Sequence, residues 1–227
     1  MTSIAENIGQ LSAQIRCLEQ RYSRAEGSVK LLAVSKRHSV ESIKAAHEAG
    51  IEDFGENYVQ EALDKIRQLS SMYVNWHFIG PIQANKTRSI AENFQWVHSV
   101  ERLKIAQRLN DQREASMAKL NVCIQVKLSD EASKSGLELT AAEALCDAVE
   151  DMPNLQLRGL MAIPKATPDI ATQRGIFRIL AQEFARLAAR YEQFDTLSMG
   201  MSNDFEAAIA EGSTLIRIGT AIFGPRE

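Results

Sequence analysis

Residues 29–36, VKLLAVSK, decide the fold, because a largely apolar run ends there in a single amine, that of Lys36. A run of this length is typical of a buried β-strand. Residues 39–50 follow, with Ser39 as a helix cap and apolar side chains at helical spacing. The sequence therefore predicts a strand, a loop that carries Lys36, and a helix, which together form one βα unit.

The same alternation continues along the chain. We predict eight strands, at or near residues 29–35, 53–54, 76–79, 96–98, 121–126, 155–160, 196–198 and 214–218. We predict helices near residues 2–22, 39–50, 57–69, 84–92, 100–110, 140–150, 173–191 and 203–211, the last capped by Asn203. Strands separated by helices pair in parallel. Their number and the chain length favour a single (β/α)8 barrel over residues 1–227, with an extra N-terminal helix. An open doubly wound sheet is the alternative, weakened by the missing G-x-G-x-x-G after the first strand.

Composition excludes several classes of protein. The 227 residues are 45% hydrophobic and 24% charged, with a net charge of −3, which fits one soluble domain and no nucleic-acid partner. No apolar stretch is long enough to span a bilayer, and the polar N-terminus is not a signal peptide. Cys17, Cys123 and Cys146 lack metal or disulfide spacing. We expect buried thiols and a cytoplasmic protein.

Polar residues recur where the predicted strands end, which is where barrels carry their chemistry. These candidates are Lys36, Glu56, Asn57, His77, His98, Lys127, Met161, Ser202, Arg217, Gly219 and Thr220. A lysine at a dry barrel mouth can lose its proton and attack an aldehyde. Lys36 and Lys127 hold nearly equivalent positions, so the pattern alone does not choose between them, and either lysine could simply be solvated.

The last two strands suggest a phosphate site, which barrels often build there. Gly200 and Gly219 permit close backbone approach, and Ser202 and Thr220 supply hydroxyl groups. The amides of the helix after Ser202 would face the same anion. The alternative is a turn glycine and an ordinary helix cap.

His77 lies in an apolar strand, so a hydrogen-bonded core histidine is the first interpretation of it. No two histidines have H-x-x-x-H spacing. We therefore predict no metal site.

Seven segments in order resemble one known family. They are LLAVSK, FGENYVQE, WHFIGPIQANK, SKSG, LRGLMAIP, LSMGMSNDFEAAI and STLIRIGTAIFG, spread over residues 30–224. In these segments the chain resembles the pyridoxal phosphate homeostasis proteins of the YggS type. That family is related to the alanine racemase N-terminal barrel, a fold-type III barrel that binds pyridoxal 5′-phosphate (PLP).

The resemblance assigns roles to the residues. It implies that Lys36, rather than Lys127, holds PLP as an aldimine and that Arg217 faces the pyridine nitrogen. It implies a phosphate site made of Ser202, Gly219 and Thr220, and a pocket lined by Asn57 and His77. The chain departs from the family at His38, where a second lysine is frequent, and in its short C-terminal tail, whereas Lys134 of SKSG is retained.

These implications favour a PLP carrier over an enzyme with demanding turnover. Arg217 can only donate to the ring nitrogen, so the ring stays unprotonated and is a weak electron sink. The racemases add a base from a second, dimerising domain, for which we expect no room after residue 218 of this chain. We expect a monomeric protein that stores PLP and delivers it, possible recipients being PLP-dependent apo-enzymes. An amino-acid racemase is the alternative, and a barrel that binds another phosphorylated metabolite non-covalently is a third class.

Overall fold

The chain folds into a closed barrel of parallel strands. The computed structural model describes residues 2–128 and 135–225. The barrel strands are β1 (Lys30–Val34), β2 (Asp53–Glu56), β3 (Asn75–Phe78), β4 (Trp96–Val100), β5 (Leu120–Lys127), β7 (Leu155–Met161), β8 (Thr196–Ser198) and β9 (Leu215–Ile218). The ring closes where β4 pairs with β5. The prediction of a (β/α)8 barrel is confirmed, and the open sheet is excluded.

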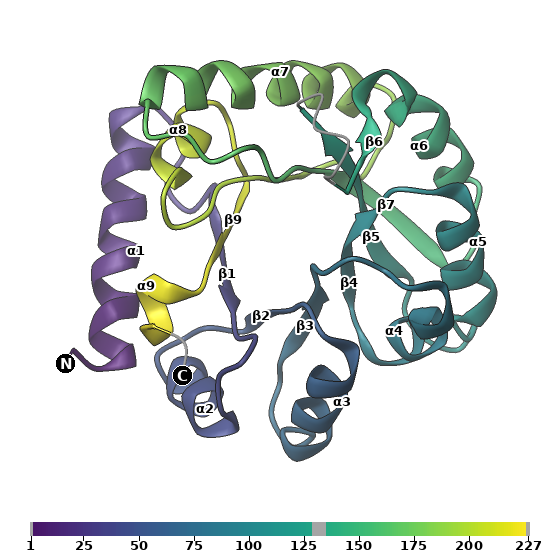
Figure 1. The fold of residues 1–227 in the computed structure, drawn as a ribbon, viewed down its shortest axis with the longest axis horizontal. Helices are drawn as coiled ribbons and strands as arrows, with labels where there is room; N and C mark the ends of the chain where they lie inside the picture. The colour runs from purple at the N-terminus through teal and green to yellow at the C-terminus, as the bar shows by residue number, and fades with distance from the viewer. Residues whose placement is uncertain (1, 129–134, 226–227) are drawn as a thin grey trace.

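Helices surround this ring of strands (Figure 1). They are α1 (Ile4–Arg21), α2 (Val40–Glu48), α3 (Val59–Gln68), α4 (Thr87–Asn93), α5 (Leu103–Gln112), α6 (Ala142–Glu150), α7 (Ile170–Ala188), α8 (Phe205–Ala210) and α9 (Thr220–Phe223). Single 3-10 turns, η1 (Ala84–Lys86) and η2 (Leu139–Ala141), precede α4 and α6. The sequence pattern did not indicate α9 or β6 (Leu137–Glu138), which pairs with β5 outside the ring. Both are too short to show a periodicity.

The extra helix α1 fixes the start of β1. Glu19 of α1 is buried, and its carboxylate accepts hydrogen bonds from the backbone N–H of Gly27 at 3.0 Å and of Val29 at 2.8 Å. A buried carboxylate that accepts backbone N–H bonds is strongly held in place. The strand that leads to Lys36 therefore begins at a defined point.

The interior of the barrel opens into a pocket at each end. Side chains two apart share one face of a strand, so Lys30, Leu32, Val34 and Lys36 all point inward from β1 and its end. Lys30 lines the pocket at the N-terminal ends of the strands, here called the lower pocket, and Lys36 lines the upper pocket at the C-terminal ends. Leu32 lies between the two pockets and belongs, with Val34 at the edge of the upper pocket, to a small buried apolar cluster separate from the main core.

The structure also bears on three smaller points, which are the burial of the cysteines, membrane spans and groups of metal-ligating side chains. Cys123 and Cys146 are buried as expected, but Cys17 is exposed on α1, so the expectation of a buried thiol is wrong there. Within residues 2–128 and 135–225, no helix is long and apolar enough to cross a membrane, and His, Cys, Asp and Glu side chains form no group that could hold a metal ion. Lys134 of the SKSG motif lies outside these ranges.

Glu211, after α8, ties that helix to α7. Its carboxylate accepts from Arg174 Nε at 2.7 Å and from Arg178 Nε at 2.9 Å, and the bond from Arg178 contributes most to a lowered pKa of Glu211. A lowered pKa stabilises the fold above the ordinary value of 4.5 and is lost as the pH falls through the lower folded value. We expect Glu211→Gln to lower the free energy of unfolding by about 1 kcal/mol at neutral pH. Denaturant titrations should show the difference shrinking in acid, and a difference that is constant with pH would contradict this account.

Candidate functional site

The upper pocket gathers most of the predicted site residues. Its volume is about 140 Å³. It is lined by Val34, Lys36, His38, Asn57, Ile79, Ile163, Met201, Ser202, Arg217, Gly219 and Thr220. Six of the seven residues that the sequence assigned to the site are therefore brought together, although they lie far apart along the chain.

Lys36 is positioned by a buried network beneath the end of β1. Lys65 of α3 donates to the backbone oxygen of Ser35 at 2.8 Å and to the carboxylates of Glu56 and Glu61 at 2.8 and 2.6 Å. Ser35 Oγ donates to Glu56 at 2.7 Å. Burial raises the pKa of Glu56, while Lys65 opposes that rise. These contacts hold the backbone that presents Lys36.

Lys127, the rival lysine, is engaged elsewhere. Its ammonium forms an ion pair with Glu138 of β6, and it does not line the upper pocket. The tertiary structure thus separates two lysines that the strand pattern left equivalent.

Arg217 is a buried cation at the base of the pocket. Its Nη1 donates to the backbone oxygen and the Oγ of Ser198 at 2.8 and 2.7 Å, and its Nη2 donates to the backbone oxygen of Ala162 at 2.9 Å. Burial lowers its pKa to about 10, with Asp204 opposing the shift, so the guanidinium stays protonated at neutral pH. Three of its five N–H donors are thus occupied within the described chain, and two remain for a ligand.

Asn57 supplies an unsatisfied acceptor. Its Oδ1 is buried and has no hydrogen-bond partner within the described residues. A Cβ on Gly80 would lie 2.3 Å from the backbone oxygen of Asn57, so only glycine at position 80 lets the two loops meet this closely. Since a buried acceptor without a donor is costly, the pocket is suited to a ligand that donates a hydrogen bond there.

The residues predicted to hold a phosphate lie together in the upper pocket. Ser202, Gly219 and Thr220 all line this pocket, and α9 begins directly after Gly219. The first N–H groups of a helix have no carbonyl of that helix to bind. A Cβ on Gly219 would come within 3.2 Å of the backbone oxygen of Val34, which keeps the loop close to β1.

The loop after β8 differs from the prediction. We expected Asn203 to cap a helix that begins directly after Ser202, but α8 begins at Phe205 and its N-cap is Asp204. Asp204 Oδ1 accepts from the backbone N–H of Met201 at 2.6 Å, so that amide is already used. The first amides of α8 therefore do not follow Ser202 directly, as the sequence predicted they would.

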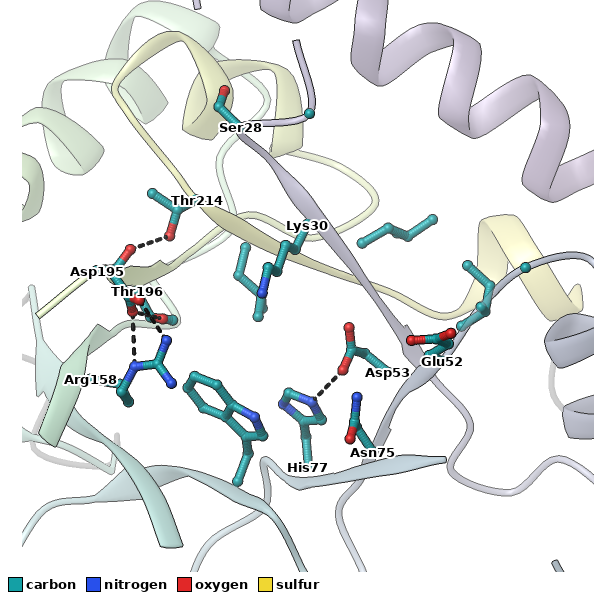
Figure 2. A pocket seen from close by; sticks show the side chains of 16 residues that line it. Ser28, Lys30, Glu52, Asp53, Asn75, His77, Arg158, Asp195, Thr196 and Thr214 are labelled. Carbon is teal, nitrogen blue, oxygen red and sulfur yellow. Dashed lines mark hydrogen bonds and ion pairs between the residues drawn. The ribbon is translucent and has the colours of Figure 1, made fainter. Parts of the chain in front are cut away.

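His77 does not lie in the upper pocket. It is buried in the barrel interior, where its Nε2 is 3.0 Å from Asp53 Oδ1, and it lines the lower pocket with Asp53 and Lys30 (Figure 2). The role implied by the resemblance is thus corrected, and the hydrogen-bonded core histidine indicated by the sequence pattern is what the structure contains. His77 points into the barrel interior from β3, one residue before the end of that strand.

His38 is a pocket residue without an assigned role in the sequence prediction. It lines the upper pocket, and its ring stacks on Phe223 of α9 at 4.7 Å between ring centres. The sequence signal was only its nearness to Lys36, because a turn from Ser35 to His38, closed by the bond from His38 N–H to Ser35 O, brings it to the pocket. His38 therefore links the loop of Lys36 to the loop that carries Gly219 and Thr220.

Known proteins resemble this chain over its whole length. The alanine racemase N-terminal domain family matches residues 7–227. Proteins named pyridoxal phosphate homeostasis protein are 56% identical in Pseudomonas aeruginosa and 50% identical in Escherichia coli K12, each covering 100% of this chain and 97% and 98% of the relative. The structure of PipY from Synechococcus elongatus with PLP bound has a TM-score of 0.86 at 35% identity, covering 98% of this chain and all of that one. Alanine racemase from Corynebacterium glutamicum shares the fold alone, at 19% identity and a TM-score of 0.69, with 61% of its length covered.

Proposed function

This chain belongs to the alanine racemase N-terminal domain family and, within it, to the pyridoxal phosphate homeostasis proteins, and from this membership we propose that it binds PLP in the upper pocket. The observation that carries the proposal is the meeting of Lys36, the buried cation Arg217 and the unsatisfied Asn57 Oδ1 in one cavity. An amine, a fixed cation, an acceptor and a hydroxyl-lined anion site match a phosphorylated aldehyde with a ring nitrogen and a ring hydroxyl.

Each residue has a separate task in this proposal. Lys36 would hold the cofactor covalently, and Ser202, Gly219 and Thr220 would hold its phosphate. Arg217 would donate to the ring nitrogen without protonating it, and Asn57 would accept from the ring hydroxyl. When bound, PLP supplies an aldehyde carbon that amines attack reversibly. The chain contributes a lysine whose backbone is held in place by the Lys65 network.

The arrangement suits storage and delivery better than turnover. Arg217 keeps its proton at neutral pH, so it does not provide the pyridinium that strengthens electron withdrawal. We propose that the protein keeps PLP bound through Lys36 in the cytoplasm and releases it to another amine, such as the active-site lysine of an apo-enzyme. We also expect it to act as a monomer.

Two experiments test this function. Reduction of the PLP-treated protein with borohydride, followed by digestion, should place the label on Lys36, and a label on Lys127 or no label would refute the binding mode. The loaded protein should then reactivate a PLP-dependent apo-enzyme while a phosphatase destroys free PLP. Reactivation no better than that from free PLP under the same conditions would refute delivery. Loss of optical rotation from L-alanine at an enzymatic rate would instead favour a racemase.

Arg217→Gln is expected to weaken PLP binding while Lys36 is still labelled. Glutamine keeps a polar side chain but loses the charge and the fork of donors, and a lost hydrogen bond to a charged group costs about 1.5–3 kcal/mol. We therefore expect the dissociation constant to rise by roughly tenfold or more, as measured by absorbance titration. Arg178→Gln, on the outer face of α7, is the matched control. Unchanged affinity in Arg217→Gln would exclude the proposed contact.

A further inference from the structure

A continuous line of polar side chains crosses the barrel interior between the two pockets. It comprises Asp53 of β2, His77 of β3, His98 of β4, Ser198 of β8 and Arg217 of β9. The successive distances are 3.0 Å from Asp53 Oδ1 to His77 Nε2, 2.9 Å from His77 Nδ1 to His98 Nε2, 3.0 Å from His98 Nδ1 to Ser198 Oγ, and 2.7 Å from Ser198 Oγ to Arg217 Nη1. Figure 2 shows the first link, at the wall of the lower pocket.

The two ends of this line fix the direction of every hydrogen bond in it. Burial is the largest single influence and works against ionisation of Asp53, but His77, Asn75 and Lys30 together hold the pKa of Asp53 below its ordinary value. The carboxylate can then only accept, so His77 carries its proton on Nε2. Burial lowers the pKa of both histidines, which are therefore neutral, with one donor and one acceptor each.

The positions of the remaining protons along the line follow from the proton on His77 Nε2. Nδ1 of neutral His77 must accept, so His98 donates from Nε2, and Nδ1 of His98 must accept in turn. Ser198 then donates its hydroxyl proton to His98 while its oxygen accepts from Arg217. All four bonds point from the cation at the upper pocket to the anion at the lower pocket. Hydrogen bonds in such a chain polarise and strengthen one another.

The surroundings leave little freedom for another arrangement. His77 and His98 are at most 1% exposed, so water does not replace either ring in the hydrogen bond between the two histidines. The His77 ring stacks on Trp96 at 5.3 Å with an angle of 6° between the planes. The charged groups nearest the two rings are Asp53 and Lys30 for His77 and Arg217 for His98. Arg158, also in the lower pocket, is paired with Asp195.

We propose that Asp53, at the opposite end of the barrel from Lys36, is a positioning residue for the cofactor pocket, acting through His77, His98 and Ser198 on the guanidinium of Arg217. The consequence for PLP rests on the proposed function, whereas the hydrogen-bond pattern itself does not. The lower pocket would thereby influence how firmly the upper pocket holds its ligand.

The pattern of protons is tested on the protein without PLP. In ¹⁵N spectra of protein labelled at histidine, at neutral pH, both buried histidines should show a protonated Nε2 and an unprotonated Nδ1. Their signals are assigned by loss in His77→Gln and His98→Gln. A protonated Nδ1 on either ring would overturn the proposal.

The coupling is tested with a pair of substitutions in neighbouring residues of the lower pocket. Asp53→Asn preserves size and an acceptor oxygen but removes the charge, and Glu52→Gln removes an exposed charge that is not part of the line. We expect Asp53→Asn to shift the nitrogen signals of His98 as well as those of His77, and to weaken PLP binding by roughly threefold to tenfold. Glu52→Gln should do neither, and Asp53→Glu should recover part of the affinity.

The outcomes separate this inference from the proposed function. If Asp53→Asn leaves both the His98 signals and the PLP affinity unchanged while Lys36 is still labelled, the coupling is refuted and the proposed function stands. If the signals shift but PLP affinity is unchanged, the positioning role is likewise refuted. If wild-type protein takes no label at Lys36, the proposed function falls, whatever the histidine spectra show.

Discussion

Lys36→Ala should reduce borohydride-stable labelling by PLP from stoichiometric to background. The side chain of Lys36 lines the upper pocket beside Asn57 and Arg217, and alanine provides no amine for attack on the aldehyde. The absorbance of the bound cofactor should change at the same time to that of free PLP. Both signals can be followed on one sample, by spectroscopy before reduction and by peptide mapping after it.

Lys127→Ala is the matched control for this experiment. Lys127 also follows a barrel strand, but its amine is paired with Glu138. We expect its replacement to leave the labelling unchanged. Residual stoichiometric label in Lys36→Ala, or its loss in Lys127→Ala, would show that the strand-end amines had been assigned the wrong way round. Circular dichroism of both variants checks that the barrel still forms.

Gly159→Ala should cause the largest loss of stability among the glycine-to-alanine substitutions in this chain. Gly159 lies in β7 at a shift in the register with β5, and its φ of +152° is one that other residues rarely adopt. An added Cβ would lie 1.8 Å from the backbone oxygen of Thr196 in β8, so the strands must separate locally. We expect a loss of roughly 3 kcal/mol in the free energy of unfolding, measured by denaturant titration.

Gly175→Ala provides the opposite expectation from the same substitution. Gly175 lies within α7, and an added Cβ would meet nothing within 4 Å. Alanine is the better helix former by about 1 kcal/mol, so this variant should be slightly more stable than the parent chain. Equal effects of the two substitutions would show that the close approach of β7 and β8 does not govern stability at position 159.

The sequence predicted the barrel because the alternation of strands and helices is a local signal repeated along the whole chain. Segments too short to show a period, such as β6 and α9, gave no such signal. The start of α8 was misplaced by one residue because Asp204 holds the N-cap position with its carboxylate turned back to the N–H of Met201, and the sequence does not reveal this loop contact. Cys17 was misjudged because a thiol alone does not tell which face of α1 it occupies.

The sequence by itself determined the type of fold, the family and six of the eleven residues that line the upper pocket, since strand ends and family motifs are written along the chain. Only the tertiary structure decided whether His77 lies in the upper or the lower pocket, which of the two lysines lines the upper pocket, and which groups pair across the barrel. They depend on distances between residues that are far apart along the chain. One example is the 3.0 Å between His98 Nδ1 and Ser198 Oγ, which are 100 positions apart. Strand spacing predicts which side chains point inward, but a hydrogen bond between them is set by the closure and register of the whole ring.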